Sequence, residues 1–278
     1  MENTVLQSET LSAVFMPRRG GKLASLVYRP AGMQMLAQPP GAYPPLRAGM
    51  PFGEGDASGF DDVFPSMGEA GKEGEWPPVP DHGMIWTSPM EASYTEGGLL
   101  LHLWADGWDY RKTARLDEDT LRLRWEIRND ASAARPFCWV CHCLWQLDQD
   151  TVFLYPPSGR EARDVLKPGA PSCDVIPSPP PDGSMAKFYF SRPLQTGQCG
   201  CIWPTRGVNM SMRWDAAELP YLGFWITNGG WRGDRNFAFE PGLSYYDTLS
   251  ESSASGTLRT AGPGETVSFE LMITLGKT

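Results

Sequence analysis

One carboxylate, Glu240, follows an apolar run at the point where a strand is expected to end. Two short apolar runs, residues 222–226 and 237–239, flank a turn rich in Gly and Asn. Side chains alternate faces along an extended chain, so the Phe rings of the second run should enter a core while Glu240 emerges on the opposite face, beside Trp225 and Asn228. A carboxylate that a rigid strand holds next to aromatic surface suits sugar chemistry. The same residues also fit a surface glutamate at the end of a strand, without a functional role.

A histidine, His142, lies in the middle of a second apolar stretch, residues 137–147, which reads FCWVCHCLWQL. On a strand it shares its face with Gln146. The opposite face then carries Phe137, Trp139, Cys141, Cys143, Trp145 and Leu147. The pattern therefore predicts an imidazole deep in a sheet, on the side away from the aromatic side chains.

A haem-attachment pattern overlaps this strand. Residues 138–142 match C-x-x-C-H, but haem needs both thiols on one edge, and strand alternation puts them on opposite faces. A zinc site is disfavoured for a similar reason, since only Cys141 and Cys143 share a face. Cys199 and Cys201 could supply a second pair, yet buried core thiols are the commoner explanation. We expect the six cysteines to be reduced thiols and predict no metal.

The other two histidines are His82 and His102. His102 fits an ordinary polar position on a strand. His82 lies in a Pro-Asp-His-Gly turn that leads into a predicted strand, where a histidine is more often structural than functional. The order of three features favours a functional role for His82. A His-Gly turn is followed about sixty residues later by a mid-strand histidine, and about a hundred residues beyond that by a strand-end Glu-Pro.

The composition favours a β protein with a small-molecule ligand. The 278 residues include 26 Pro, 30 Gly and 11 Trp, which indicates many turns and many aromatic side chains. The net charge of −9 argues against nucleic acid or an anionic membrane as a partner, and mildly against a phosphorylated substrate. The first residues do not read as a signal peptide, and no apolar window is long enough to span a membrane, so we expect a cytoplasmic location.

Strand signals recur along the whole chain. They predict strands at 11–16, 23–27, 84–86, 91–94, 99–104, 110–116, 120–128, 137–147, 152–155, 187–190, 200–203, 208–214, 222–226, 237–239, 255–259 and 266–275. No segment shows a helical apolar stripe over three turns. The fold class is therefore all-β, and we expect a single antiparallel β-sandwich domain over residues 1–278.

Two long segments are rich in Pro and Gly. The first, residues 30–80, contains Phe52, Phe60, Phe64 and Trp76, which a disordered linker would hardly keep exposed. We therefore expect it to be an ordered excursion that packs on the body of the protein. The second segment, which runs from 168 to 181, is predicted to be a loop.

Several motifs together resemble the aldose 1-epimerase, or galactose mutarotase-like, family. They are GKLASL at 21–26, DHG at 81–83, His142 in its aromatic strand and FEPG at 239–242, in the family's order and spacing. Residues 59–66, GFDDVFPS, look like the G-W-x-E-x-F-P pattern of a less characterised branch, with Phe60 for Trp and Asp62 for Glu. The resemblance implies a large antiparallel β-supersandwich with a concave, open sugar-binding face.

The resemblance also implies a reaction, the interconversion of sugar anomers, and a role in it for each candidate residue. Interconversion of sugar anomers removes the proton of the C1 hydroxyl and protonates the ring oxygen, and one base and one acid suffice without a cofactor. By similarity Glu240 is the base, His142 the acid and His82 a hydrogen-bonding partner of the sugar. A histidine near a carboxylate can be protonated at neutral pH, which supports this pairing. Further candidates for contacting the sugar are Trp225, Trp231, Asn228, Asp62 and Arg47.

Two other functions remain open at this stage. A carbohydrate-binding protein would keep an aromatic cleft without a working acid–base pair. A lyase or glycosidase on the same fold is the other alternative, and a glycosidase would need a second carboxylate near Glu240, for which Asp61, Asp62 and Asp234 are candidates. The sequence does not decide between a free hexose, an unusual sugar and a sugar phosphate, and it predicts no oligomeric state.

Overall fold

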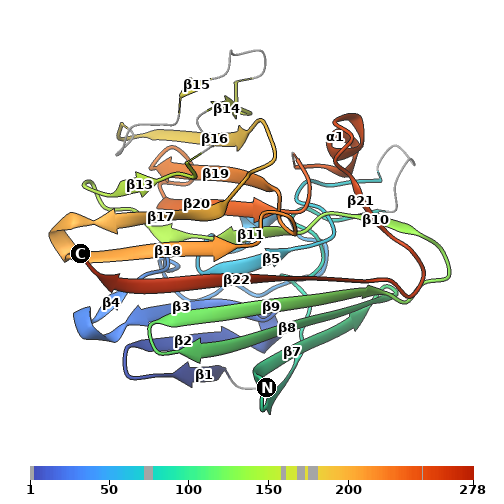
Figure 1. Cartoon of the computed structure of the whole chain (residues 1–278), viewed down its shortest axis with the longest axis horizontal. Helices are drawn as coiled ribbons and strands as arrows, with labels where there is room; N and C mark the ends of the chain where they lie inside the picture. The colour runs from blue at the N-terminus through green and yellow to red at the C-terminus, as the bar shows by residue number, and fades with distance from the viewer. Residues whose placement is uncertain (1–2, 72–77, 158–160, 168–172, 175–180, 246) are drawn as a thin grey trace.

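The computed structural model describes residues 3–71, 78–157, 161–167, 173–174, 181–245 and 247–278. Two antiparallel sheets make up most of this chain (Figure 1). The main path of the 12-stranded sheet is β1 (Thr4–Gln7), β2 (Leu11–Met16), β3 (Lys22–Tyr28), β5 (Phe60–Val63), β11 (Val140–Cys143), β20 (Arg235–Gly242), β19 (Tyr221–Asn228), β16 (Ser184–Phe190), β14 (Glu161–Asp164) and β15 (Cys173–Asp174). Two short strands lie off this path, β4 (Met33–Gln34) beside β3 and β12 (Trp145–Gln146) beside β20.

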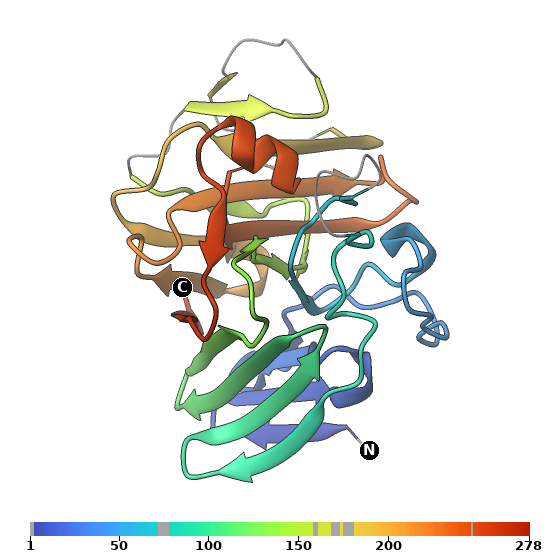
Figure 2. The same ribbon diagram turned by 90° about the vertical axis from the view of Figure 1, so that its right-hand side faces the viewer.

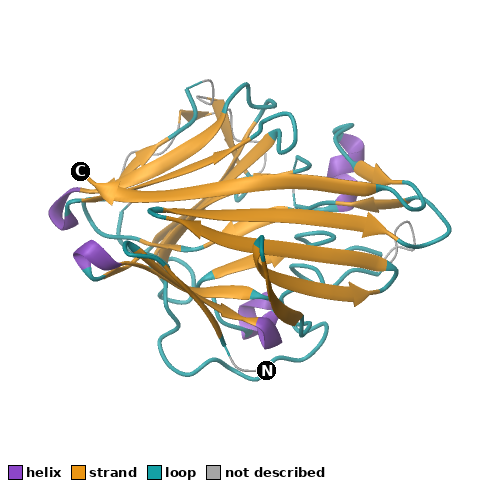
Figure 3. Ribbon diagram, turned by 60° about the horizontal axis from the view of Figure 1, so that its bottom comes forward, coloured by secondary structure: helices purple, strands orange, loops and turns teal. Residues whose placement is uncertain are grey.

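The 8-stranded sheet has the order β13 (Val152–Leu154), β17 (Gly197–Trp203), β18 (Val208–Trp214), β22 (Thr266–Lys277), β9 (Thr120–Asn129), β8 (Trp108–Asp117), β7 (Gly98–Ala105) and β6 (Glu91–Thr95). A separate pair consists of β10 (Arg135–Phe137) and β21 (Arg259–Ala261). The helical segments are α1 (Leu249–Ala254) and the 3-10 turns η1 (Pro17–Arg19), η2 (Arg29–Ala31), η3 (Phe52–Glu54) and η4 (Pro204–Arg206). Figure 3 shows these segments at the margins of a body built of strands. Within the described ranges no helix is long and apolar enough to cross a membrane.

The two sheets enclose an aromatic core. Trp139, directly before β11, lies with its ring centroid 4.6 Å from that of Trp125 in β9 and 4.5 Å from that of Phe269 in β22. Phe153 of β13 meets Phe237 of β20 at 4.8 Å. In Figure 2 the green strands β7 to β9 lie in front of the blue N-terminal strands, which shows the same layering at the other end of the molecule. The predicted all-β sandwich is thus confirmed.

Side-chain alternation works as predicted in the strands that matter for the site. On β20 the rings of Phe237 and Phe239 are buried in the core, and Ala238 and Glu240 point to the opposite face. On β9 every second residue is fully buried, from Leu121 onward, between charged neighbours. The face of each residue could therefore be predicted from the local pattern alone.

Three predicted strands differ in the structure. Residues 84–86 form a turn, because they connect the tight turn at His82 to β6 and belong to neither sheet. Residues 255–258 form a turn and coil after helix α1, and Arg259 begins β21. The first turn of α1 is closed by a capping box between Thr248 and Glu251. The stretch 137–147 is divided among β10, β11 and β12, although the split of its faces is as predicted.

The excursion between β3 and β6 is ordered where the structure describes it. It contains η3 and β5, and the rings of Phe52, Phe60 and Phe64 are buried. Trp76 lies outside the described residues, and so does most of the predicted loop at 168–181. Three residues of this excursion line the cavity described below: Phe52 of η3, Ala57 and His82.

An ion pair lies between the two sheets, closed off from solvent. Lys112 of β8 donates to Asp62 of β5 with Nζ 3.2 Å from Oδ1, and both side chains are completely buried. Trp125 Nε1 also donates to Asp62 Oδ2 at 3.2 Å, and the Lys112 ammonium lies 4.6 Å from the ring centroid of Phe60. Asp62 therefore points into the core, on the same face of β5 as Phe60. The prediction that Asp62 contacts substrate is wrong for this reason.

Candidate active site

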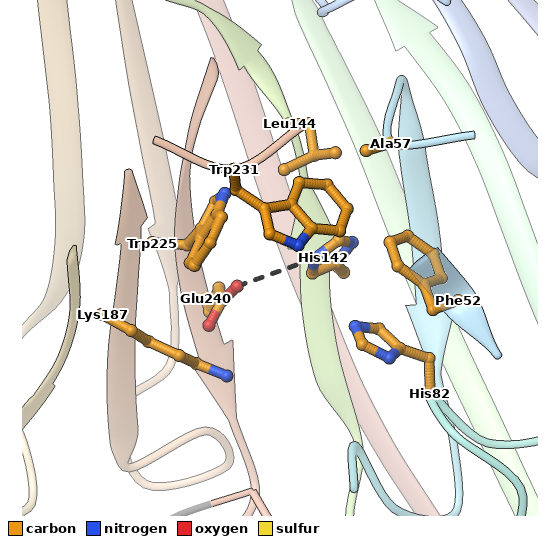
Figure 4. Close-up of a pocket in the computed structure, with 9 residues that line it drawn as sticks. All are labelled: Phe52, Ala57, His82, His142, Leu144, Lys187, Trp225, Trp231 and Glu240. Carbon is orange, nitrogen blue, oxygen red and sulfur yellow. Dashed lines mark ion pairs between the residues drawn. The ribbon is translucent and has the colours of Figure 1, made fainter. Parts of the chain in front are cut away.

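Four adjacent strands of the 12-stranded sheet, β11, β20, β19 and β16, form the floor of a cavity of about 200 Å³ (Figure 4). The cavity is lined by Phe52, Ala57, His82, His142, Leu144, Lys187, Trp225, Trp231 and Glu240. The strand register explains the arrangement, since Ala238, Trp225 and Lys187 are direct partners across β20, β19 and β16 and share the face away from the core. The structure thus brings together five residues singled out from the sequence: Glu240, His142, His82, Trp225 and Trp231.

A glycine on the neighbouring strand makes room for the Glu240 carboxylate. Gly223 of β19 is the register partner of Glu240. A Cβ atom at Gly223 would lie 2.9 Å from Glu240 Oε2, closer than real Cβ contacts, and 3.2 Å from Tyr189 Cε1, which is also tight. The carboxylate therefore lies over backbone and not over a side chain, where it stays buried from solvent while facing the cavity.

Glu240 and His142 face each other without a hydrogen bond. His142 Nε2 and Glu240 Oε1 are 3.9 Å apart, the contact drawn as a dashed line in Figure 4. That distance is too long for a hydrogen bond. Oε2 of Glu240 and Nδ1 of His142 are also buried, and neither has a hydrogen-bond partner among the described residues. Buried polar atoms are nearly always paired in folded proteins, so two such atoms in one cavity wall indicate a place for a polar ligand.

Burial decides the protonation of this pair. It raises the pKa of Glu240 to about 7, an effect that Lys187 opposes and Asp247 increases. It lowers the pKa of His142 well below the usual value, and the positive charges of His82 and Lys187 act in the same direction. The contact counts as an ion pair only when His142 is protonated. The burial instead favours a neutral imidazole beside a carboxyl group whose pKa is raised to about 7, which differs from the protonated His142 that the sequence led us to expect.

His82 reaches the cavity from a turn with an uncommon backbone. Its φ is +58°, in the left-handed region, and Gly83 follows with φ +74°. A Cβ at Gly83 would lie 2.0 Å from the carbonyl oxygen of Phe64, so only glycine fits there. The ring of Phe52 stacks on the His82 ring with centroids 4.0 Å apart and planes 11° apart, and Nδ1 lies 2.7 Å from Asp81 Oδ1. These contacts hold the His82 ring in one orientation.

A permanent cation, Lys187, reaches the cavity from β16. Its Nζ donates to Asp247 Oδ1 at 2.7 Å, and the hydroxyl of Tyr189 donates to the same oxygen. Burial works against the charge of Lys187, but the carboxylates of Asp247 and Glu240 outweigh it and raise the pKa of the amine. Lys187 is therefore an ammonium ion that already faces two acidic groups.

Trp225 and Trp231 form one wall of the cavity, and Arg232 holds the turn that carries Trp231. The rings of Trp225 and Trp231 meet edge to face, with centroids 6.0 Å apart and planes at 89°. Arg232, next in the β19–β20 turn, donates from Nη1 to the carbonyl oxygens of Gly53 at 2.7 Å and Gly55 at 3.1 Å. These two hydrogen bonds connect the turn to the segment that carries Phe52. Apolar rings beside a few polar groups are the usual lining of small-molecule sites.

Three predicted substrate contacts lie elsewhere. Asn228 ends β19 beyond the cavity, and its Nδ2 donates to Asp182 Oδ1 at 3.0 Å. Arg47 is 72% exposed at its side chain and pairs with Glu54 at 3.0 Å. Asp62, as described above, is in the core. The sequence predicts Asn228 beside Glu240 across the turn, but the register pairs Asn228 with Arg235, five positions along β20 from Glu240.

Four lining residues were not predicted: Phe52, Ala57, Leu144 and Lys187. Leu144 could have been found, because it shares a strand face with His142. Lys187 gives a weaker signal, a single charge in the strand MAKFYF, and its place depends on the pairing of β16 with β19. Phe52 and Ala57 lie in the irregular excursion, where no periodicity predicts which side chains turn inward.

Comparison of the whole fold identifies similar structures. No protein-family model matches the sequence, and no curated protein matches it either. The solved structure of Slr1438 from Synechocystis sp. PCC 6803 superposes with a TM-score of 0.78 at 16% identity, covering 100% of this chain and 96% of that one. A galactose mutarotase related enzyme from Lactobacillus acidophilus gives 0.76 at 13% identity, with 100% and 98% covered. A galactose mutarotase-like protein from Lactobacillus casei ATCC 334 gives 0.73 at 14% identity, with 99% and 100% covered. This chain therefore has the galactose mutarotase-like fold over its whole length.

Proposed function

We propose that the protein is a cofactor-independent sugar mutarotase of the aldose 1-epimerase type. The observation that carries the proposal is the convergence of Glu240, His82 and His142 on one cavity, where an acidic group and two imidazoles face each other. The names of two similar structures, a galactose mutarotase related enzyme and a galactose mutarotase-like protein, support the same interpretation through the shared fold.

The proposed reaction needs one proton to leave the sugar and one to arrive. Glu240, as carboxylate, takes the proton of the C1 hydroxyl while an imidazole gives a proton to the ring oxygen, so that the C1–O5 bond breaks and the C1 carbonyl forms. After rotation about the C1–C2 bond, the reverse transfers close the ring on the other face. Positioned acids and bases of this kind each contribute about 10²–10⁴ in rate. The tryptophan wall would hold the apolar face of the ring.

The pKa of Glu240 predicts the low-pH limb of the activity. The carboxylate form accepts the proton, and burial raises its pKa to about 7, so it is lost as the pH falls through that value. We expect kcat/KM to fall about tenfold per pH unit below about pH 7, after subtraction of the spontaneous anomer exchange measured at each pH. The check is the exchange rate between pH 5 and 8, and a rate that stays constant from pH 5 to 7 would exclude Glu240 as the base.

The two alternative functions make different demands on the site. A glycosidase needs a second carboxylate about 5–10 Å from the first. Among the described lining residues Glu240 is the one acidic side chain. The sequence candidates for its partner lie elsewhere, since Asp61 is paired with Lys22, Asp62 is in the core and Asp234 lies beside Arg232. A sugar-binding protein without catalysis is the stronger rival.

The experiment is anomer exchange measured by NMR across a panel of free aldoses and their phosphates. We expect wild-type protein to accelerate exchange of at least one sugar above the buffer rate. Sugar-induced chemical-shift changes without acceleration would favour the binding protein. A panel with neither binding nor acceleration would contradict both interpretations of the cavity.

A further inference from the structure

We propose that Lys187 is a positioning residue that keeps the Glu240 carboxyl group ionised, and so ready to accept the C1 proton, while a sugar occupies the cavity. Asp247 and Tyr189 hold the ammonium group in place for this role. The inference rests on the proposed mutarotase function and adds to it a residue that takes no part in proton transfer. Lys187 keeps its proton throughout and acts on the sugar only through Glu240.

The ammonium group of Lys187 is anchored by residues outside the cavity lining. Its Nζ donates to Asp247 Oδ1 at 2.7 Å and lies 2.9 Å from Met67 Sδ, and the Tyr189 hydroxyl donates to the same oxygen of Asp247. The backbone carbonyl of Asp247 accepts from the backbone N–H groups of Met67 at 3.1 Å and Gly68 at 2.8 Å. An ammonium group has three N–H bonds, so one remains for the cavity that Lys187 lines.

The strand register brings Lys187 close to the row that contains Glu240. Tyr189, the next residue on the same face of β16, pairs with Gly223 of β19, which in turn pairs with Glu240 of β20. Because Gly223 has no side chain, nothing on β19 separates the carboxylate from the side chains of β16. Figure 4 shows the Lys187 side chain reaching from β16 toward the Glu240 carboxylate, on another side of it from His142.

Most titratable groups around Glu240 carry no charge near neutral pH. These groups are His142 and Cys141 of β11, Lys187 and Tyr189 of β16, His82 of the turn before β6, and Asp247. Burial lowers the pKa of His142 well below its usual value and raises the pKa of Tyr189 and of Cys141 well above theirs. Apart from His82, the charges that remain are therefore the ammonium of Lys187 and the carboxylate of Asp247.

These two charges act on Glu240 in opposite directions. Burial raises the pKa of Glu240 to about 7, while the charge of Lys187 lowers it and that of Asp247 raises it. Burial also works against the charge of Lys187, but Asp247 and Glu240 outweigh it and raise the pKa of the amine. A sugar that fills the cavity displaces water, and charges interact more strongly where water is excluded. Without Lys187 the carboxyl group would therefore stay protonated at neutral pH and could not accept the C1 proton.

The first test is Lys187→Met, which fills similar space without the charge. We expect the low-pH limb of kcat/KM to move up by about one pH unit, the lower end of the effect of an opposite charge near a carboxylate. The value at pH 7 should then fall about fivefold, while the value at pH 9 should stay within about threefold of the wild type. Lys187→Arg retains the charge and should return the limb to within about 0.3 pH units of the wild type.

The second test, Asp247→Asn, should move the limb in the opposite direction. The amide oxygen can still accept from Lys187 and from Tyr189, so the ammonium group keeps its place after the negative charge beside it is removed. We expect the limb to fall by about half a pH unit and kcat/KM at pH 6 to rise about two- to threefold. Damage to the fold would not increase activity. The double variant with Lys187→Met should have a limb between those of the two single variants.

A matched control is available on the same sheet. Lys167, just after β14, also pairs with an aspartate, Asp164, at 3.4 Å, but its side chain is 76% exposed and does not line the cavity. Lys167→Met should leave the limb unmoved. The ionisation of Glu240 is also read without any activity, from the ¹³C carboxyl signal of glutamate-labelled protein that is missing in Glu240→Gln.

The outcomes separate this inference from the proposed function. A carboxyl titration of Glu240 that is unmoved in folded Lys187→Met protein, or that moves in the same direction in Asp247→Asn, would overturn the role of Lys187. A shifted titration with an unshifted activity limb would overturn its part in the reaction. A wild type without exchange, whose carboxyl titration nevertheless shifts as expected in the variants, would reject the mutarotase proposal and leave only the electrostatic effect of Lys187 on Glu240.

Discussion

Glu240→Gln is expected to reduce anomer exchange by about 10²–10⁴ while leaving sugar affinity within a few fold. The amide has nearly the same shape as the carboxylate but cannot accept the C1 hydroxyl proton. The loss should therefore appear in kcat, and a titration of the variant with the same sugar should still show binding. The rate is measured by NMR exchange spectroscopy on the substrate that the wild type turns over.

The same substitution is expected to stabilise the fold at alkaline pH. Burial raises the pKa of Glu240 in the folded protein to about 7 from its ordinary value of 4.5, so the folded state favours the protonated form. The stability that this preference supplies is full below pH 4.5 and disappears as the pH rises through about 7. At pH 8 the variant lacks the cost of a buried charge and should be more stable by about 1–3 kcal/mol. Urea unfolding at pH 8 and pH 5 measures both values, and the difference should be small at pH 5.

The combination of lost activity and gained stability is what identifies a functional carboxylate. A Glu with a merely structural role would lower both when replaced, since its contacts would be lost. A variant that is less stable at pH 8 yet retains exchange would contradict a catalytic role for the buried Glu240 carboxylate.

Lys112→Met is expected to destabilise the protein by about 3–5 kcal/mol. Methionine fills similar space, but it leaves the Asp62 carboxylate in the core without its counter-ion. The free energy of unfolding in urea gives the loss, and activity of the folded fraction should be normal because the pair lies on the far side of the sheet from the cavity. Lys277→Met, at an exposed lysine, is the control and should change stability by less than about 0.5 kcal/mol.

The double variant Lys112→Met with Asp62→Leu tests the reason for this loss. With both charges gone, neither ion of the pair is left buried, and much of the stability should return. A single variant as stable as the wild type would show that Asp62 takes up a proton or reaches water, contrary to the closed geometry between the sheets. A double variant no better than the single one would mean that packing around Lys112, and not its charge, matters.

Local sequence patterns were enough to predict the faces of individual strands. Alternation placed Phe237 and Phe239 in the core and Glu240 opposite, and it placed His142 on the face away from Trp139. The fold class followed from the number of such strands and from the motifs shared with a known family. These predictions depend only on neighbours within a few residues, which is the range over which sequence periodicity is informative.

Which other side chains reach the cavity depends on contacts between segments that are distant in the sequence. Lys187 reaches Glu240 because β16 pairs with β19, and Phe52 reaches His82 through an irregular segment. Asp62 looked like a polar site residue, yet the strand face that it occupies meets the second sheet, where it pairs with Lys112. The lowered pKa of His142 has the same origin, since the burial of this side chain depends on residues from separate strands and loops.

The structure of a complex tests the central claim most directly. A crystal of Glu240→Gln protein with an aldose that the wild type equilibrates should trap the sugar in the cavity. We predict the C1 oxygen within about 2.6–3.2 Å of the side chain at position 240, with the ring oxygen turned toward the imidazoles of His82 and His142. A sugar bound outside this cavity, or one whose C1 points away from position 240, would contradict the proposal that this carboxylate works on the anomeric hydroxyl.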